Sequence, residues 1–258
     1  MEHNADKPAV VVAATAGQRT VLVARAILFW LGMLLSTVII APLSLLTFPL
    51  PFVQRYRFIG LWARFNLWWL ERSCGLRYQV DGAENIPAAN AIIMAKHQSA
   101  WETLALQRIF GPQVWVMKRE LLWVPLFGWG LALLEPIAID RKAGRKAVRQ
   151  VVEQGIQRLR AGRWVVIFPE GTRVAPGERK RYGIGGALLA EQSGYPVVPV
   201  AHNAGEFWRR RSFIKYPGVI RVVIGAPIVS TGKPAADIIA EVEDWIESTL
   251  LKITTIPA

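Results

Sequence analysis

The sequence predicts an α/β fold, in which a single domain built on a mixed sheet flanked by helices follows an N-terminal membrane-associated helical element. Two observations support this prediction. The 29 residues from Ala26 to Gln54 carry no charge, and from about Leu76 onward short apolar runs alternate with segments of helical periodicity. The chain has 258 residues, 52% of them apolar, which is enough to bury a core and excludes disorder for most of its length. We expect a loose tail at 1–20, membrane-associated helices at 21–74 and the α/β domain at 75–258.

The uncharged stretch is long enough to cross a bilayer. As a helix, the part before Pro49 would extend roughly 34 Å. It is too long for the core of a signal peptide, so we expect an uncleaved membrane anchor. Arginines lie on both sides of the stretch, so the positive-inside rule predicts no strong orientation. A re-entrant hairpin bent at Pro42 or in the segment Pro49–Pro51 fits equally well, and a buried core hairpin broken at Pro42 is the soluble alternative.

A second helix is predicted directly after this stretch. Phe58, Leu61, Trp62, Phe65 and Trp69 recur at helical spacing, while charged residues share another face. Such an amphipathic helix suits the membrane–water interface, where Trp is enriched. It could also pack on the α/β domain, and the two interpretations are compatible.

Seven apolar runs in the rest of the chain are typical of strands. They are Leu76–Val80, Ala91–Lys96, Gln113–Lys118, Leu134–Asp140, Trp164–Pro169, Pro196–His202 and Val219–Ile224. Helical segments are predicted between them and after them, near 100–110, 143–161, 184–193 and 234–252. In sheets of this kind, functional residues usually follow the carboxyl ends of the strands.

Composition excludes several classes of protein. The single cysteine, Cys74, excludes an intramolecular disulfide framework and a multi-cysteine zinc site. The few histidines form no usual metal-ligand spacing with nearby carboxylates, so we expect no metal. The net charge of +12 favours an anionic partner, but no nucleic-acid-binding module is recognisable and we expect no nucleic acid. There is also no Gly-x-Ser-x-Gly elbow of a serine hydrolase.

The segment KHQSAWE, residues 96–102, lies where a strand gives way to a helix. Its His97 and Glu102 have the parts of a general base and the carboxylate that orients it. Such a pair could activate a hydroxyl group of a substrate. Alternatively, the sequence from Ser99 to Glu102 is a capping box, in which Glu102 accepts a hydrogen bond from the backbone N–H of Ser99. His202, at the end of another strand, could line a site or be a structural histidine.

Two further segments follow strands. FPEGTR, residues 168–173, offers backbone amides, a carboxylate and the guanidinium of Arg173, which together suit a phosphate, although it could be a turn with a surface arginine. KRELLWVPLFG, residues 118–128, begins with two cations that could simply be solvated.

Together these segments make the chain resemble the glycerolipid acyltransferase family typified by lysophosphatidic acid acyltransferases. The resemblance covers roughly residues 75–230 and depends on KHQSAWE, KRELLWVPLFG, FPEGTR and VVPVAHN (197–203), which occur in the family's order. It implies that 75–258 is an acyltransferase domain. Where the family has Asp five residues after the histidine, this chain has Glu102, so the choice of acceptor could differ.

The resemblance also implies a role for each matching residue. His97 would be the general base for the free hydroxyl of 1-acylglycerol 3-phosphate, with Glu102 as its acid partner. The acyl group would come from acyl-CoA or acyl carrier protein as co-substrate, giving phosphatidic acid without a cofactor. The residues expected around the acceptor phosphate are Lys118, Arg119, Glu170, Gly171, Thr172 and Arg173, and those expected to wall the acyl chain are Leu121, Pro125, Val198 and Pro199. Arg141 fits a recurring position only weakly.

Other functions remain open on the sequence. The acceptor could be a lyso-ornithine lipid, another lysophospholipid or glycerol 3-phosphate, or the chain could be a non-catalytic basic protein of the membrane surface. Membrane lipids are expected partners, since residues 141–181 hold twelve Lys and Arg against three Glu, a patch that suits anionic lipid or the phosphates of an acyl carrier. The resemblance places the protein at a bacterial inner membrane with its active site on the cytoplasmic side.

Overall fold

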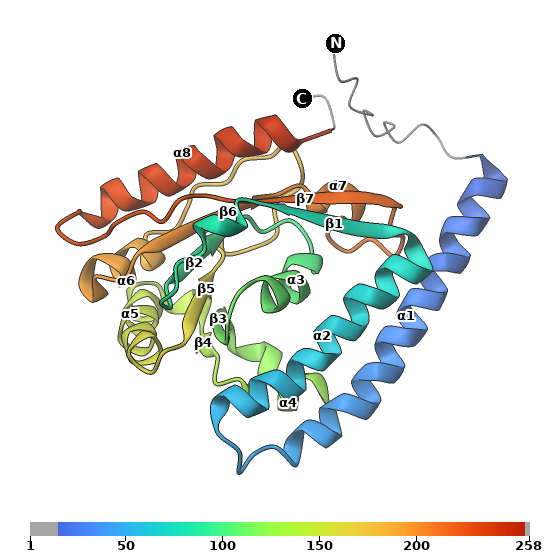
Figure 1. Ribbon diagram of the computed structural model, residues 1–258, viewed down its shortest axis with the longest axis horizontal. Helices are drawn as coiled ribbons and strands as arrows, with labels where there is room; N and C mark the ends of the chain where they lie inside the picture. The colour runs from blue at the N-terminus through green and yellow to red at the C-terminus, as the bar shows by residue number, and fades with distance from the viewer. Residues whose placement is uncertain (1–14, 256–258) are drawn as a thin grey trace.

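The computed structural model describes residues 15–255, and Figure 1 shows a sheet with helices on both sides. The helices are α1 (Ala16–Leu45), α2 (Phe52–Cys74), α3 (Trp101–Ile109), α4 (Phe127–Leu133), α5 (Arg145–Arg160), α6 (Gly185–Ser193), α7 (Ala204–Phe207) and α8 (Ala235–Ile253), with short 3-10 turns η1 (Ala83–Asn85), η2 (Arg119–Trp123) and η3 (Arg141–Ala143). The strands are β1 (Leu76–Asp81), β2 (Ile92–Ala95), β3 (Gln113–Lys118), β4 (Ile137–Ile139), β5 (Trp164–Ile167), β6 (Val197–His202) and β7 (Gly218–Ile224).

The seven strands form one mixed sheet in the order β1-β7-β6-β2-β5-β3-β4. Neighbouring strands are parallel except β6 and β7, which pair antiparallel. The predicted fold class is therefore confirmed. The run Leu134–Asp140 shortens to β4 because Glu135 has φ +49° and Pro136 has no N–H to donate to a neighbouring strand.

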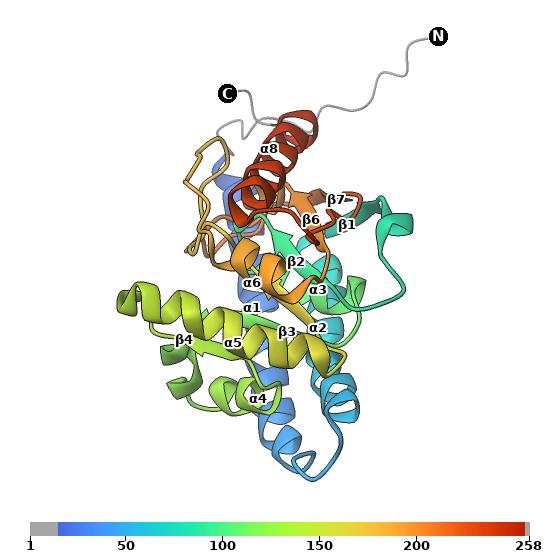
Figure 2. The same cartoon turned by 90° about the vertical axis from the view of Figure 1, so that its left-hand side faces the viewer.

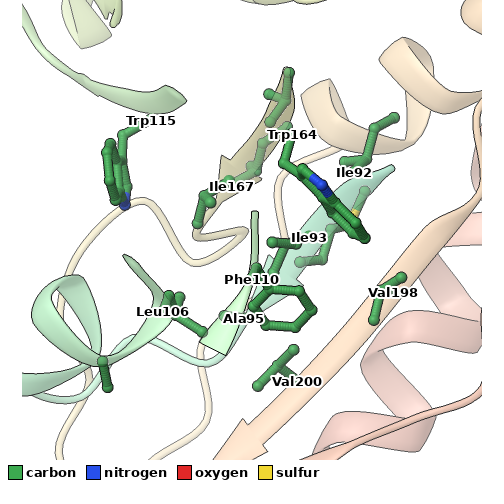
Figure 3. Packing of buried hydrophobic residues seen from close by; sticks show 14 of the residues in the cluster. Ile92, Ile93, Ala95, Leu106, Phe110, Trp115, Trp164, Ile167, Val198 and Val200 are labelled. Carbon is green, nitrogen blue, oxygen red and sulfur yellow. The ribbon is translucent and has the colours of Figure 1, made fainter. Parts of the chain in front are cut away.

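Three layers build the domain. Helices α5, α6 and α8 cover one face of the sheet, as Figure 2 shows, and α2 and α3 lie on the other with α1 outside them (Figure 1). Figure 3 shows how the core between the layers is filled: β2 contributes Ile93, β6 contributes Val198 and Val200, and α3 with the residue after it contributes Leu106 and Phe110. All five side chains are buried, as expected for a sheet covered on both faces.

Helices α1 and α2 form an antiparallel hairpin. The chain reverses between Leu46 and Pro51, whereas Pro42 lies inside α1, so the bend is not at Pro42. The two helices approach closely at Gly32, where an added Cβ would lie 2.1 Å from Nε1 of Trp69. Helix α1 is long and apolar enough to cross a membrane by its length and composition. Many of its side chains are exposed, Leu34 and Leu35 to 62% each.

The expected tail at 1–20 is wrong for residues 16–20, which begin α1. The side chain of Thr15 accepts a hydrogen bond from the backbone N–H of Gln18, and the side-chain oxygen of Gln18 accepts one from the backbone N–H of Thr15, so a capping box starts the helix. The rest of the expected tail, residues 1–14, lies outside the described residues.

Helix α2 has two apolar faces. Ile59, Ala63 and Leu67 are buried against the protein, while Leu61 and Phe65 are 46% and 39% exposed. The predicted amphipathic helix therefore packs on the domain with one face and leaves the other uncovered.

Candidate active site

The sheet brings the predicted motifs to one edge. Strands β2, β5, β3 and β4 are parallel neighbours, so the segments that follow them emerge side by side. His97 follows β2, the segment 168–173 follows β5, Lys118 ends β3, and Arg141 follows β4. Residues spread over the chain therefore meet at one place.

His97 and Glu102 form a hydrogen-bonded pair. Nδ1 of His97 lies 2.8 Å from Oε1 of Glu102, and the imidazole stacks on the ring of Phe168 with centroids 4.1 Å apart. Oε1 also accepts the backbone N–H groups of Gln98 (2.9 Å) and Ser99 (2.8 Å). Glu102 therefore holds the loop before α3 and orients the imidazole at the same time, and Nε2 of His97 is the ring nitrogen that remains for a substrate.

The environment keeps Glu102 charged. Burial by itself would raise the pKa of its carboxyl, but the attraction of His202 and His97 and the hydrogen bonds from His97 and Ser99 hold it below its ordinary value. His202 is buried behind the site. Its Nε2 lies 2.8 Å from the carbonyl oxygen of Lys96, and the N–H of Ala204 donates to its Nδ1, which identifies a structural histidine. Burial lowers the pKa of His202, against the attraction of Glu102.

A cavity of about 370 Å³ opens beside His97, within the range of pockets that bind small molecules. Its polar end contains His97, Arg141 and Arg173, and the remaining lining is mostly apolar. The apolar wall comes from α1, α2, β3, η2 and α4, and includes Ile40, Ala41, Ile59, Trp62, Trp115, Leu121, Phe127 and Leu131. The cavity can therefore hold a hydrocarbon chain with an anionic group at the arginine end.

Of the residues expected at the acceptor phosphate, Arg173 lines this cavity. Gly171 lines a neighbouring groove, which shares Arg141 and Phe168 with the cavity. Glu170 lines the same groove as Gly171, but its carboxylate lies under the backbone of His97. A buried anion in that position cannot bind a phosphate, which is also negative.

Several other expected contacts lie apart from the cavity. Lys118 is exposed at the end of β3, and Arg119 pairs with Asp140 at 3.0 Å. Thr172 and Pro125 are not among the residues that line the cavity. Val198 and Pro199 do not line the cavity, because they pair with Ile93 and Met94 inside the sheet, below the edge where His97 lies.

The sequence interpretation missed the contribution of the N-terminal helices. Thr37, Ile40, Ala41 and Ser44 of α1 line the cavity at spacings of three, four and seven residues, which is one face of a helix. The sequence did contain one sign of this contribution, because the hydroxyl side chains of Thr37 and Ser44 lie on one face of an otherwise apolar run. Within residues 15–255, no group of three or more His, Cys, Asp or Glu side chains could hold a metal ion.

Comparisons with known proteins show the family to which the chain belongs. Residues 77–203 match the family model described as Acyltransferase. The chain is 45% identical over 242 residues to a 1-acyl-sn-glycerol-3-phosphate acyltransferase of Pseudomonas aeruginosa, covering 92% of this chain and 94% of that protein. It is 32% identical over 193 residues to the Saccharomyces cerevisiae protein of the same name, covering 71% and 63%.

Among solved structures, the fold is similar to that of a 1-acyl-sn-glycerophosphate acyltransferase from Thermotoga maritima. The TM-score is 0.75 at 21% sequence identity, over 93% of this chain and 98% of the other. That likeness supports the fold. The match to the family model and the extent of the similarity to the Pseudomonas protein show that the chain belongs to the acyltransferase family and is an O-acyltransferase.

Proposed function

We propose that this O-acyltransferase transfers a fatty acyl group from a thioester to the free hydroxyl of 1-acylglycerol 3-phosphate, giving phosphatidic acid. The observation that carries the proposal is the His97–Glu102 pair at the arginine end of an apolar cavity. A lysophospholipid has the same two parts, a phosphate beside a hydroxyl and a long hydrocarbon chain. The names of the relatives support this choice of acceptor.

His97 acts as the general base in the proposed reaction. Its Nε2 takes the proton of the acceptor hydroxyl as the oxygen attacks the thioester carbonyl carbon. The tetrahedral intermediate then collapses, the carbon–sulfur bond breaks, and the thiolate leaves and takes the proton back from the imidazolium. Glu102 fixes the tautomer and stabilises the imidazolium between the two steps. No acyl-enzyme forms and no cofactor is needed.

The acceptor phosphate binds to Arg173 and Arg141, which line the polar end of the cavity. Lys118 lies outside the cavity lining, at the end of β3, and would add a further cation from the same edge of the sheet. We assign the apolar part of the cavity to an acyl chain. Because α1 and α2 form part of the cavity wall, the acyl chain enters the cavity from the membrane. The α1–α2 hairpin lies in the cytoplasmic leaflet of a bacterial inner membrane.

Acyl transfer in detergent or liposomes tests the proposal. Wild-type protein, His97→Ala and Glu102→Ala are given lysophosphatidic acid with acyl-CoA in one arm and acyl carrier protein thioester in the other. Phosphatidic acid from the wild type and not from His97→Ala supports both the reaction and its base. Full activity of His97→Ala would overturn the mechanism. Product only with a lyso-ornithine lipid, another lysophospholipid or glycerol 3-phosphate would overturn the acceptor, and no product with any acceptor would overturn the function.

A further inference from the structure

A buried group of charges lies directly behind His97. Nζ of Lys96 is 2.7 Å from Oε1 of Glu247 and 3.0 Å from Oε1 of Glu170. The three side chains are 1%, 9% and 0% exposed, in that order. Tyr182 donates a hydrogen bond of 2.9 Å to Oε1 of Glu247. The proposed chemistry uses none of these groups directly.

This group is joined to the catalytic base through Glu170. Oε2 of Glu170 accepts the backbone N–H of His97 at 3.0 Å, while its other oxygen faces Lys96. The carbonyl oxygen of His97 accepts the N–H of Val174 at 2.8 Å. Both backbone polar groups of His97 are therefore hydrogen-bonded. The partner of its N–H, Glu170, is itself paired with Lys96.

Lys96 is the only cation among the described residues within 4.0 Å of Glu170, and it lies between two anions. Buried charges are costly unless they are paired, so loss of the ammonium would leave the Glu170 carboxylate without its counter-ion. Burial already raises the pKa of Glu170, against the attraction of Lys96. Without Lys96 the carboxyl would take up a proton or move, and in either case its hydrogen bond to His97 would change.

Glu247 fixes Lys96 in turn. It comes from α8, which lies outside the residues that match the family model and packs on β6, the neighbour of β2. Arg179 also approaches Glu247, at 3.6 Å, but its side chain is 67% exposed. Such an exposed pair contributes little.

We propose that Lys96 and Glu247 are positioning residues for acyl transfer, which act through Glu170 to fix the backbone of His97. Helix α8 is thereby part of the support of the catalytic base. This inference rests on the proposed function only in that it takes His97 as the catalytic base. The effect of Lys96 and Glu247 on the position of the imidazole does not depend on that function.

The test uses the full chain in detergent and the variants Lys96→Met and Glu247→Gln. Glu243→Gln, one turn earlier on α8, and Arg179→Ala are matched controls. We expect kcat to fall about 10- to 100-fold in the two test variants, because small displacements of a catalytic group have effects of this size. KM for both substrates should stay within about twofold, since neither residue contacts substrate. Both controls should keep wild-type kinetics.

A spectroscopic arm separates positioning from general destabilisation. The chain has three histidines, so a protein labelled with ¹⁵N-histidine gives an imidazole spectrum simple enough to assign with His97→Ala. In folded Lys96→Met and Glu247→Gln, the His97 resonance should shift or broaden, and in Glu243→Gln it should stay. An unchanged resonance with unchanged kcat would overturn the proposal. If the wild type proves inactive with every acceptor, the proposed function fails, while this spectrum still tests the placement of His97.

A double variant tests the route through Glu170. If Lys96 acts through that carboxylate, Lys96→Met/Glu170→Gln should lose no more kcat than Lys96→Met alone, because the amide oxygen of glutamine can accept the His97 N–H without a counter-ion. If the fold-losses in kcat of the two single variants multiply in the double variant, the two residues act independently and the route through Glu170 is overturned.

Discussion

Oε1 of Glu102 lies 2.8 Å from Nδ1 of His97 and, at the same time, 2.8 Å from the backbone N of Ser99. One carboxylate thus orients the proposed base and holds the turn that carries it. The sequence offered a capping box and a catalytic pair as alternatives. The Ser99 N–H contact expected of the capping box and the His97 contact use the same carboxylate, whereas Oγ of Ser99 accepts the N–H of Trp101 and does not complete the box. Glutamate in place of the family's aspartate remains compatible with an oriented imidazole.

Glu102→Asp should separate the two tasks. The shorter side chain withdraws the carboxylate by about one carbon–carbon bond, so it cannot reach His97 and both N–H donors from the same backbone position. We expect kcat to fall about 10- to 100-fold, and Glu102→Gln to fall further because it favours the wrong tautomer of His97. Steady-state kinetics of acyl transfer would measure this. Wild-type kcat in both variants would contradict the assigned role.

Arg173→Ala should weaken binding of the acceptor. Loss of one charge-assisted hydrogen bond to phosphate costs about 1.5–3 kcal/mol, which corresponds to a KM for lysophosphatidic acid roughly 10- to 100-fold higher. The KM for the thioester should change little. Arg221→Ala is a suitable control, because Arg221 of β7 pairs with Asp81 of β1 and does not line the cavity. A rise confined to the thioester KM would reassign Arg173 to the donor.

Gly130→Leu should shorten the acyl chains that the enzyme accepts. Gly130 of α4 lines the cavity, and an added Cβ would meet Oγ of Ser44 at an ordinary 3.6 Å, so the backbone tolerates a side chain there. The rest of the leucine would occupy part of the cavity. Competition between thioesters and acceptors of different chain length would measure the shift. Gly60→Leu on α2, where a Cβ meets nothing within 4 Å, is the control, and an equal shift in both variants would contradict the assignment.

Lys215 lies in a cage of aromatic rings between α1 and the domain. Its Nζ is 3.7 Å from the centre of a Trp30 ring and 4.9 Å from rings of both Phe29 and Trp208, and it donates a hydrogen bond to the carbonyl oxygen of Phe213. The side chain is fully buried. Loss of hydration lowers the pKa of Lys215 to about 7.

The stability of the protein should therefore rise with pH above about 7. Between pH 7 and 10.5 the unfolded chain keeps the Lys215 proton and the folded chain releases it, so the unfolded state binds more protons. One proton gives a slope of at most about 1.4 kcal/mol per pH unit, and the cation–π contacts, which favour the charged form, reduce it. Thermal unfolding at pH 7–9 would measure the trend. Lys215→Met should flatten it and Lys233→Met, at the surface, should not; a flat wild-type profile would contradict the prediction.

The sequence was sufficient for the sheet and the place of the site, because both follow from short-range patterns. Alternating apolar runs mark the strands, and motifs that follow parallel strands meet at one edge whatever the loop lengths. That is why His97, Arg173 and Arg141 could be expected near one another.

The direction of individual side chains could not be predicted in the same way. Glu170 turns under His97 because Lys96 and the His97 N–H are there to receive it, which is a matter of tertiary contact. Val198 and Pro199 belong to a matching motif, but they lie inside β6, where packing buries them away from the cavity. The hydroxyl side chains on one face of α1 distinguish that face from the others, but which part of the domain Thr37 and Ala41 meet depends on how the hairpin docks.

The edge strand β1 has a consequence for the order in which the chain is made. It pairs with β7, and the bonded side chains of Asp81 and Arg221 are 140 residues apart. During synthesis the α1–α2 hairpin is complete long before β7 has been made, so the backbone N–H and C=O groups of β1 stay unpaired in the meantime. Such late, distant pairing slows folding and exposes an edge to other chains. Early insertion of the hairpin would tether β1 at the membrane and limit those encounters until β7 arrives.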